Sequence, residues 1–144
     1  MEAHYYTVNL NWDAARKGTI SSPELNETIE VATPPQFPQG IEGIWSPEHL
    51  LTAAVESCFM TTFLSIAENS KLQFSSFKCH SRGKLDKEDG KLWMTEIFLE
   101  PELIISNEAD REKAERILHK SEAACLITHS IKSKVIMTPL IKVE

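Results

Sequence analysis

The chain has 144 residues, 42% of them hydrophobic, which is enough for one compact domain with a sizeable core, and we expect a single domain over residues 1–144. Its 15 basic and 21 acidic residues give a net charge of -6, which argues against binding to nucleic acid because no basic surface is available for phosphates. The first residues form no signal sequence and no stretch approaches the apolar length of a membrane span, so we expect a cytoplasmic protein without membrane contact.

The N-terminal part predicts a hairpin or meander of strands. Every second residue from Tyr6 to Trp12 is apolar, which is the period of a strand with one face on a core. A polar turn follows at residues 15–18, and residues 19–22 and 26–33 predict further strand. The segment 33–45 is rich in proline and glycine and predicts a surface loop.

A long helix is predicted next. Ser46 is a good N-cap, Pro47 suits the first helical position, and Glu48 lies near the positive end of the helix dipole. The helix is expected to end near Asn69, and its apolar residues cover nearly the whole circumference, so it must be buried. A single domain of this size has little material to surround such a helix, and we therefore predict an obligate homodimer.

The second half predicts a hairpin, a helix and a strand. Residues 77–85 and 92–99 have strand character and flank a polar turn at 86–90. Asn107 can cap a second helix, on which Cys125 shares one face with apolar residues and points toward the core. Residues 133–143 predict a closing strand, and Pro139 suggests a sheet edge.

Three cysteines, Cys58, Cys79 and Cys125, form no CxxC pair and are odd in number, which argues against a disulfide framework and favours reduced thiols. By composition alone, Cys58 is best interpreted as a small core residue of the long helix. Cys79 lies on the inner face of its strand, and a structural role is expected. The five histidines lack metal-binding spacing, so neither a metal nor a cofactor is predicted.

The string Ser46-Pro-Glu-His-Leu-Leu-Thr-Ala-Ala-Val-Glu-Ser-Cys-Phe59 resembles the motif of the OsmC/Ohr family, the osmotically inducible and organic hydroperoxide resistance proteins. In that family a Pro-Glu-x-Leu helix start precedes an Ala-Cys-Phe, and a second cysteine lies near the end of a later helix, here Ala123-Ala-Cys-Leu126. The segment Trp12-Asp-Ala-Ala-Arg-Lys-Gly-Thr-Ile-Ser21 is also similar to the family's tryptophan, arginine and glycine segment. The resemblance covers nearly the whole chain.

This resemblance implies an α+β fold in which antiparallel strands pack around a long buried central helix, in an intertwined homodimer. It also implies that Cys58 is the peroxidatic cysteine, Cys125 the resolving cysteine, and Arg16 and Glu48 the charged pair that activates the thiolate. A guanidinium beside a thiol favours its ionised form, and a carboxylate can hold the guanidinium in place. Arg82 is a minor alternative for the activating cation.

Ten residues separate Glu48 from Cys58, about 15 Å along a straight helix, which is beyond direct reach. We therefore expect Glu48 to serve the partner's Cys58, so that each active site is composite.

The function implied is a thiol-dependent peroxidase that reduces organic hydroperoxides, with hydrogen peroxide as a further candidate, through a Cys58 sulfenic acid and a Cys58–Cys125 disulfide. An external dithiol, of lipoyl type by the resemblance, would reduce the disulfide. One alternative is a non-catalytic protein of the same fold that binds an apolar ligand at the dimer interface. A redox sensor is a third possibility.

Overall fold

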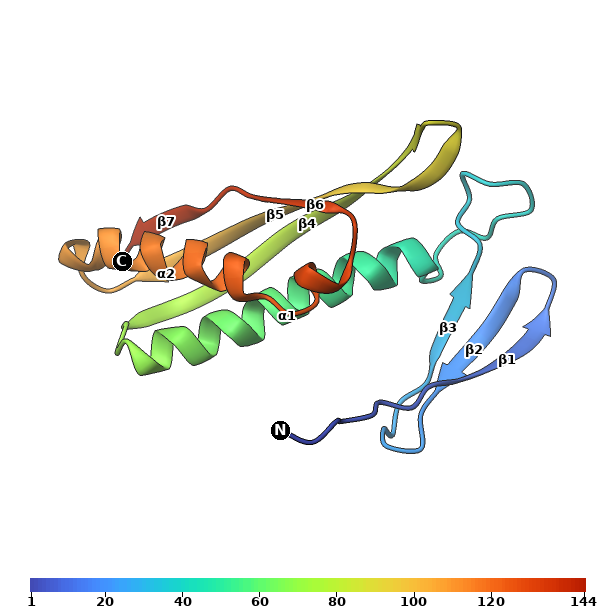
Figure 1. Cartoon of the computed structure of the whole chain (residues 1–144), viewed down its shortest axis with the longest axis horizontal. Coiled ribbons are helices and arrows are strands. Elements are labelled where there is room, and N and C mark those ends of the chain that lie inside the picture. Colours follow the sequence, from blue (N-terminus) through green and yellow to red (C-terminus); the bar gives the residue numbers. More distant parts are fainter. The chain divides into compact units, whose positions relative to one another are not determined.

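A computed structural model describes residues 1–144 and shows an α+β protein, as predicted (Figure 1). The chain divides into two compact units, Met1–Leu50 and Leu51–Glu144. The first unit holds three strands, and the second holds two helices and a four-stranded sheet. A single domain over the whole chain stays a prediction.

The N-terminal unit is an antiparallel meander in the order β1-β2-β3, which confirms the expected arrangement. Its strands are β1 (Asn9–Ala14), β2 (Lys17–Ser21) and β3 (Ile29–Ala32). The expectation that β1 turns one face to a core is wrong within this unit, because all six of its residues are exposed. Three short strands alone bury few side chains.

Helix α1 (Pro47–Asn69) begins and ends where the sequence predicts. The Ser46 hydroxyl caps it by accepting a hydrogen bond from the His49 N–H at 3.1 Å. Lys71, with φ 55°, then turns the chain out of the helix.

Within a single chain α1 is only partly buried, and its further burial by a second subunit stays a prediction. Only one stripe at four-residue spacing is fully buried within the chain, namely Val55, Phe59, Phe63 and Ala67. Met60 and Leu64 remain 39% and 42% exposed. The expectation that no stretch approaches a membrane span is wrong by length and composition, because α1 has 23 residues and contains an 18-residue stretch with a mean hydropathy of 1.6. Core helices of soluble proteins meet the same criterion, so this is weak evidence for a membrane.

A long hairpin forms the centre of the C-terminal unit. Strand β4 (Phe74–Glu88) pairs antiparallel with β5 (Lys91–Ile105), which confirms the predicted hairpin and extends it at both ends. The connecting residues Asp89 and Gly90 have φ values of 51° and 77°, as a two-residue hairpin turn requires. Along β5, alternate residues from Thr95 to Ile105 are buried, so one face of the strand belongs to the core.

The C-terminal segment completes this sheet in an unexpected way. It forms two short strands, β6 (Lys134–Met137) and β7 (Leu140–Val143), and both pair parallel with β5. The prediction of one closing strand is therefore wrong, and the predicted antiparallel pairing holds for β1–β2–β3 and β4–β5 but not for β6 and β7. Pro139 lacks an N–H and interrupts the ladder, while the Thr138 N–H donates to the Leu99 carbonyl at 2.9 Å and keeps the chain at the edge.

Helix α2 (Arg111–Ala124) connects β5 to β6 and is flanked by two short 3-10 helices, η1 (Glu108–Asp110) and η2 (Thr128–Ser130). Asn107 caps η1 rather than α2. The buried residues of α2 recur at spacings of three and four, from Ala114 to Ser121.

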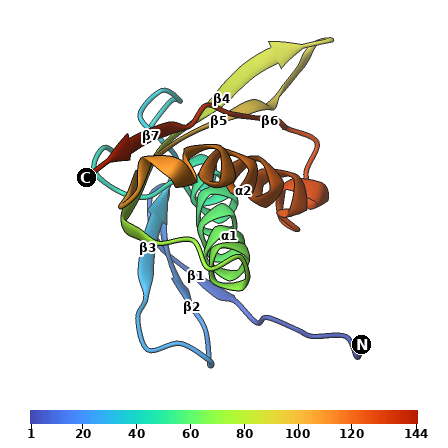
Figure 2. The same ribbon diagram turned by 90° about the vertical axis from the view of Figure 1, so that its left-hand side faces the viewer.

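Helices α1 and α2 both cover the same face of the β4–β7 sheet (Figure 2). Their buried side chains and those of β5 form one apolar cluster. Within it, Phe63 stacks on Phe77 with ring centroids 4.8 Å apart and meets Phe74 edge-on at 5.3 Å. This packing fixes the middle of α1, which carries Cys58, against the rest of the unit.

Candidate active site

The chain after α2 passes close to the middle of α1 (Figure 1), and the cysteine at each of these places affects the pKa of the other. Cys58 lies on α1 and is partly exposed, whereas Cys125 follows the last residue of α2 and is only 1% exposed. At Cys125 the backbone leaves the helix in an extended conformation, with φ -66° and ψ 115°. Both thiols are free.

The surroundings of Cys58 favour its ionised form. Burial opposes ionisation and is the largest single effect, but several hydrogen bonds together outweigh it. Their donors are the Cys125 thiol, the Ile127 N–H, the Thr62 hydroxyl and the Leu126 N–H. As a result, the pKa of Cys58 lies below its ordinary value, and the thiol is activated as a nucleophile.

The surroundings of Cys125 have the opposite effect. Burial raises the pKa of Cys125, a hydrogen bond with Thr128 partly opposes the rise, and the hydrogen bond to Cys58 adds to it. Of the two thiols, Cys58 is therefore the one that ionises more readily. A thiol that ionises readily near a second thiol with a raised pKa is an arrangement suited to disulfide chemistry once the first sulfur is oxidised.

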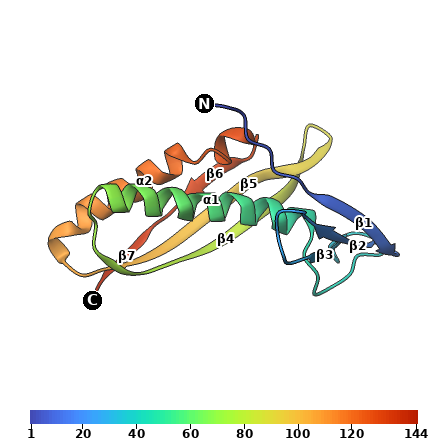
Figure 3. The same ribbon diagram turned by 90° about the horizontal axis from the view of Figure 1, so that it is seen from below.

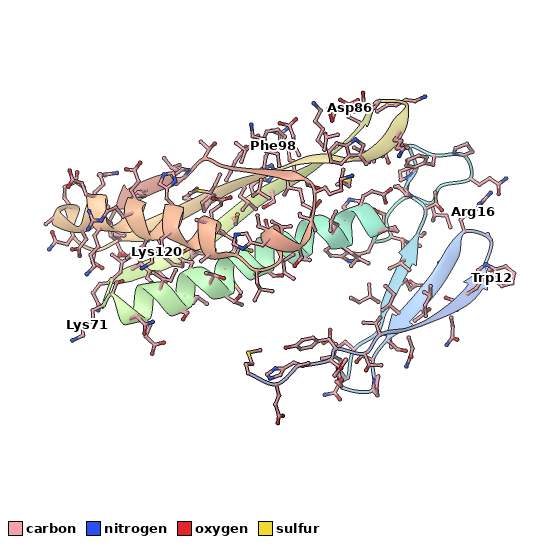
Figure 4. All side chains as sticks on the ribbon, viewed as in Figure 1. Trp12, Arg16, Lys71, Asp86, Phe98 and Lys120 are labelled. Carbon is pink, nitrogen blue, oxygen red and sulfur yellow. The ribbon has the colours of Figure 1, made fainter.

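Arg16 and Glu48 belong to the other compact unit, so of the four predicted site residues only the two cysteines are brought together within one unit. Arg16 lies at the β1–β2 turn and projects from the hairpin, as does Trp12 (Figure 4). The Arg16 Nε donates to the Gln39 side chain at 3.4 Å. Glu48 lies in the first turn of α1, as predicted.

The alternative cation, Arg82, is engaged elsewhere. It forms an ion pair with Glu100 at 3.9 Å, and its guanidinium lies over the Phe98 ring at 5.0 Å. Cys79 is half-buried and contacts the apolar cluster. Burial raises the pKa of Cys79, with a smaller opposing effect from a hydrogen bond to Ser81, so this thiol has the character of a structural residue.

A family model described as OsmC-like protein matches residues 40–139, which is more than half of the chain. The chain belongs to the OsmC-like protein family. This finding bears out the family resemblance of the motif around Cys58.

Similar proteins agree with this family. An uncharacterized protein of Bacillus subtilis (strain 168), YmaD, is 25% identical over 94% of this chain and 91% of its own length. Among solved structures, an OsmC-like protein of unknown function from Vibrio cholerae has a TM-score of 0.87 at 22% identity and covers 96% of this chain and 100% of its own.

The fold is also shared by the organic hydroperoxide resistance protein OhrB of Bacillus subtilis. Its TM-score is 0.70 at 18% identity, with 96% of this chain and 98% of that chain covered. At such a low sequence identity the similarity shows only a shared fold. OsmC-like proteins with different names have this fold in common.

Sequence reasoning missed three donors to Cys58 in this OsmC-like protein: Thr62 and the main-chain N–H groups of Leu126 and Ile127. Thr62 could have been found, because it lies one helical turn after Cys58 on the same face of α1. The two N–H groups could not, because nearly every residue type has one.

Proposed function

We propose that this OsmC-like protein is a cysteine-based hydroperoxide reductase in which Cys58 attacks the peroxide and Cys125 resolves the oxidised sulfur. The observation that carries the proposal is that a partly exposed thiol of lowered pKa and a buried thiol of raised pKa lie close enough to affect each other's ionisation. The names of solved structures with this fold, which include an organic hydroperoxide resistance protein from Legionella pneumophila and OhrB, support the same chemistry.

The cycle begins when the Cys58 thiolate attacks the terminal oxygen of a hydroperoxide. The O–O bond breaks, the sulfur becomes a sulfenic acid, and the alkoxide leaves as an alcohol after taking a proton. Cys125 then attacks the Cys58 sulfur, the S–O bond breaks, and water leaves as the disulfide forms. An external dithiol supplies two electrons and two protons and restores both thiols, and a cytoplasmic location would keep such a reductant available.

Arg16 and Glu48 complete the proposed site. Arg16 orients the peroxide oxygens and favours the thiolate, and Glu48 holds the guanidinium by an ion pair. Since Glu48 lies ten residues before Cys58 on α1, it acts on the partner's Cys58 across a homodimer interface. The exposed apolar side chains of α1, Met60 and Leu64, supply a surface that a second copy of the chain can cover.

The central experiment is a dithiol-coupled peroxidase assay that compares the wild type with Cys58→Ser, Cys125→Ser and the matched control Cys79→Ser. We expect Cys58→Ser to abolish turnover and Cys79→Ser to retain it. Cys125→Ser should still consume one equivalent of peroxide per Cys58 but lose the disulfide. Wild-type protein that turns over no organic hydroperoxide and no hydrogen peroxide would leave the non-catalytic, ligand-binding interpretation in its place.

The composite site has its own test. A heterodimer is prepared with Cys58→Ala on one chain and Glu48→Ala on the other. If Glu48 acts across the interface, one site loses both Cys58 and Glu48, while the other keeps both and remains active at half of the wild-type level. If Glu48 acts within its own chain, each site lacks one residue and turnover collapses, which would refute the shared site.

A further inference from the structure

Helix α1 and strand β4 meet through polar side chains beside the apolar cluster. The helix lies beside this strand in the C-terminal unit (Figure 3). A Cβ atom placed on Gly83 would lie only 2.2 Å from the Thr52 hydroxyl oxygen, so the lack of a side chain at Gly83 lets the helix come close to the strand. One helical turn after Thr52, Glu56 meets Ser81, which is two residues before Gly83 on β4. A helical turn and two strand residues each span roughly 6 Å, so the two contacts are in register.

Glu56, Ser81 and Cys79 form a chain of hydrogen bonds at this contact. The Ser81 hydroxyl donates to Glu56 Oε2 at 2.5 Å, and Ser81 Oγ lies 3.5 Å from the Cys79 sulfur. All three side chains are half-buried. A carboxylate on α1 is thereby connected through a hydroxyl to the third thiol of the chain.

The direction of these hydrogen bonds decides which form of Cys79 fits. A hydroxyl has one proton and a carboxylate only accepts, so the Ser81 proton belongs to the bond with Glu56. Toward Cys79, Ser81 then offers lone pairs, to which a thiol can donate and a thiolate cannot. Ionisation of Cys79 would place a negative sulfur against an oxygen lone pair and near a carboxylate. The geometry therefore favours the protonated thiol.

The electrostatic surroundings agree with this geometry. Burial raises the pKa of Cys79, and the charge of Glu56 raises it further. Ser81 lowers this pKa when its hydroxyl donates to the sulfur, which requires it to turn away from Glu56. Glu56 is the one charged side chain that shifts the pKa of Cys79, since Glu100 acts through its main chain and its carboxylate pairs with Arg82.

We propose that Glu56 and Ser81 are positioning residues that hold Cys79 as the un-ionised thiol and thereby exclude it from the reactions of Cys58 and Cys125. The first half of this inference stands by itself, and the second half rests on the proposed function. A third ionised thiol would react with peroxide and would also compete with Cys125 for the oxidised Cys58. Glu56 and Ser81 would thus determine which thiols take part.

The test titrates Cys79 as the only thiol of the full chain, in a parent protein that carries Cys58→Ser and Cys125→Ser. Thiolate formation is followed by ultraviolet absorbance, and the same chain with Cys79→Ser as well supplies the background of the tyrosines. Glu56→Gln removes the charge and supplies an amide that can donate to Ser81, whose own proton is then free to turn to the sulfur. We expect roughly tenfold more Cys79 thiolate at a given pH below the titration midpoint.

Two further variants separate the contributions. Glu68→Gln is the matched control, because it removes the same charge from an exposed position on the same helix, and it should titrate like the parent protein. Addition of Ser81→Ala to Glu56→Gln should reverse part of the gain, because no hydroxyl remains to donate to the sulfur. Equal midpoints for Glu56→Gln and Glu68→Gln, or a gain that Ser81→Ala leaves intact, would overturn the proposal. Iodoacetamide labelling of Cys79 in the chain with all three cysteines, located by mass spectrometry, gives the same comparison without the background substitutions.

The exclusion from peroxide chemistry is measured on the same variants with tert-butyl hydroperoxide. Attack by the Cys79 thiolate breaks the O–O bond and yields a sulfenic acid and an alcohol, and the sulfenic acid is trapped and quantified by mass spectrometry. Glu56→Gln should form it roughly tenfold faster than Glu68→Gln at neutral pH. A lowered midpoint without faster oxidation would overturn the exclusion. Absence of peroxide turnover in the wild type would refute the proposed function and leave the titration result standing, because the titration needs no peroxide.

Discussion

Removal of the Cys125 thiol is expected to slow the reaction of Cys58 before any disulfide chemistry takes place. Burial raises the pKa of Cys58, and several neighbouring groups lower it. Among these groups, the Cys125 thiol has the largest effect. In Cys125→Ala this donor is lost and the pKa of Cys58 rises. Cys58 keeps contact with solvent, which weakens the interaction. The thiolate should therefore lose about 1.5 kcal/mol of stabilisation, the low end for a hydrogen bond to a charged group. That corresponds to a roughly tenfold smaller thiolate fraction at neutral pH.

The assay is the pH dependence of Cys58 alkylation, measured on fully reduced protein for the wild type, Cys125→Ala and Cys125→Ser. The serine variant keeps a hydroxyl donor and should fall between the other two at neutral pH. All three rates should agree above the highest of the three pKa values. An alanine variant that follows the wild-type profile throughout would show that the contact between the two thiols does not activate Cys58.

Three further predictions concern stability, assembly and the third cysteine. Phe63→Ala should destabilise the fold by about 3–5 kcal/mol in chemical denaturation, because Phe63 is fully buried and stacks on Phe77. Leu64→Glu places a charge on the exposed apolar side of α1 and should shift a dimer toward monomer in sedimentation, whereas an unchanged mass would argue against an interface there. Cys79→Ala should keep Cys58 alkylation at the wild-type rate and cost about 1 kcal/mol of stability, since the thiol is only half-buried and its pKa is raised by burial.

Much of the fold follows from local sequence signals. Ser46 and Pro47 fix the start of α1 through capping and backbone preference, which act within one helical turn. The hairpin β4–β5 follows from alternating residues on both sides of Asp89 and Gly90, which adopt the positive φ that the turn requires. The family was recognisable from residues on a single helix, because the motif around Cys58 is contiguous in the chain.

Other features were decided only by tertiary structure. The residue types of β6 and β7 favour strands, but nothing in them states that both pair parallel with β5, since strand direction depends on the path of the intervening helix α2. The extent of burial of α1 likewise depends on which elements reach it, and within the chain they cover only one stripe.

The candidate site combines both kinds of information. The sequence determined which side chains carry sulfur, and the motif predicted which two of the three cysteines act in the proposed chemistry. Tertiary structure alone brought Cys125 near enough to Cys58 for each thiol to affect the pKa of the other. The physical reason is that Cys58 and Cys125 lie far apart in the chain, so their proximity depends on how the end of α2 packs against α1 and not on residue type.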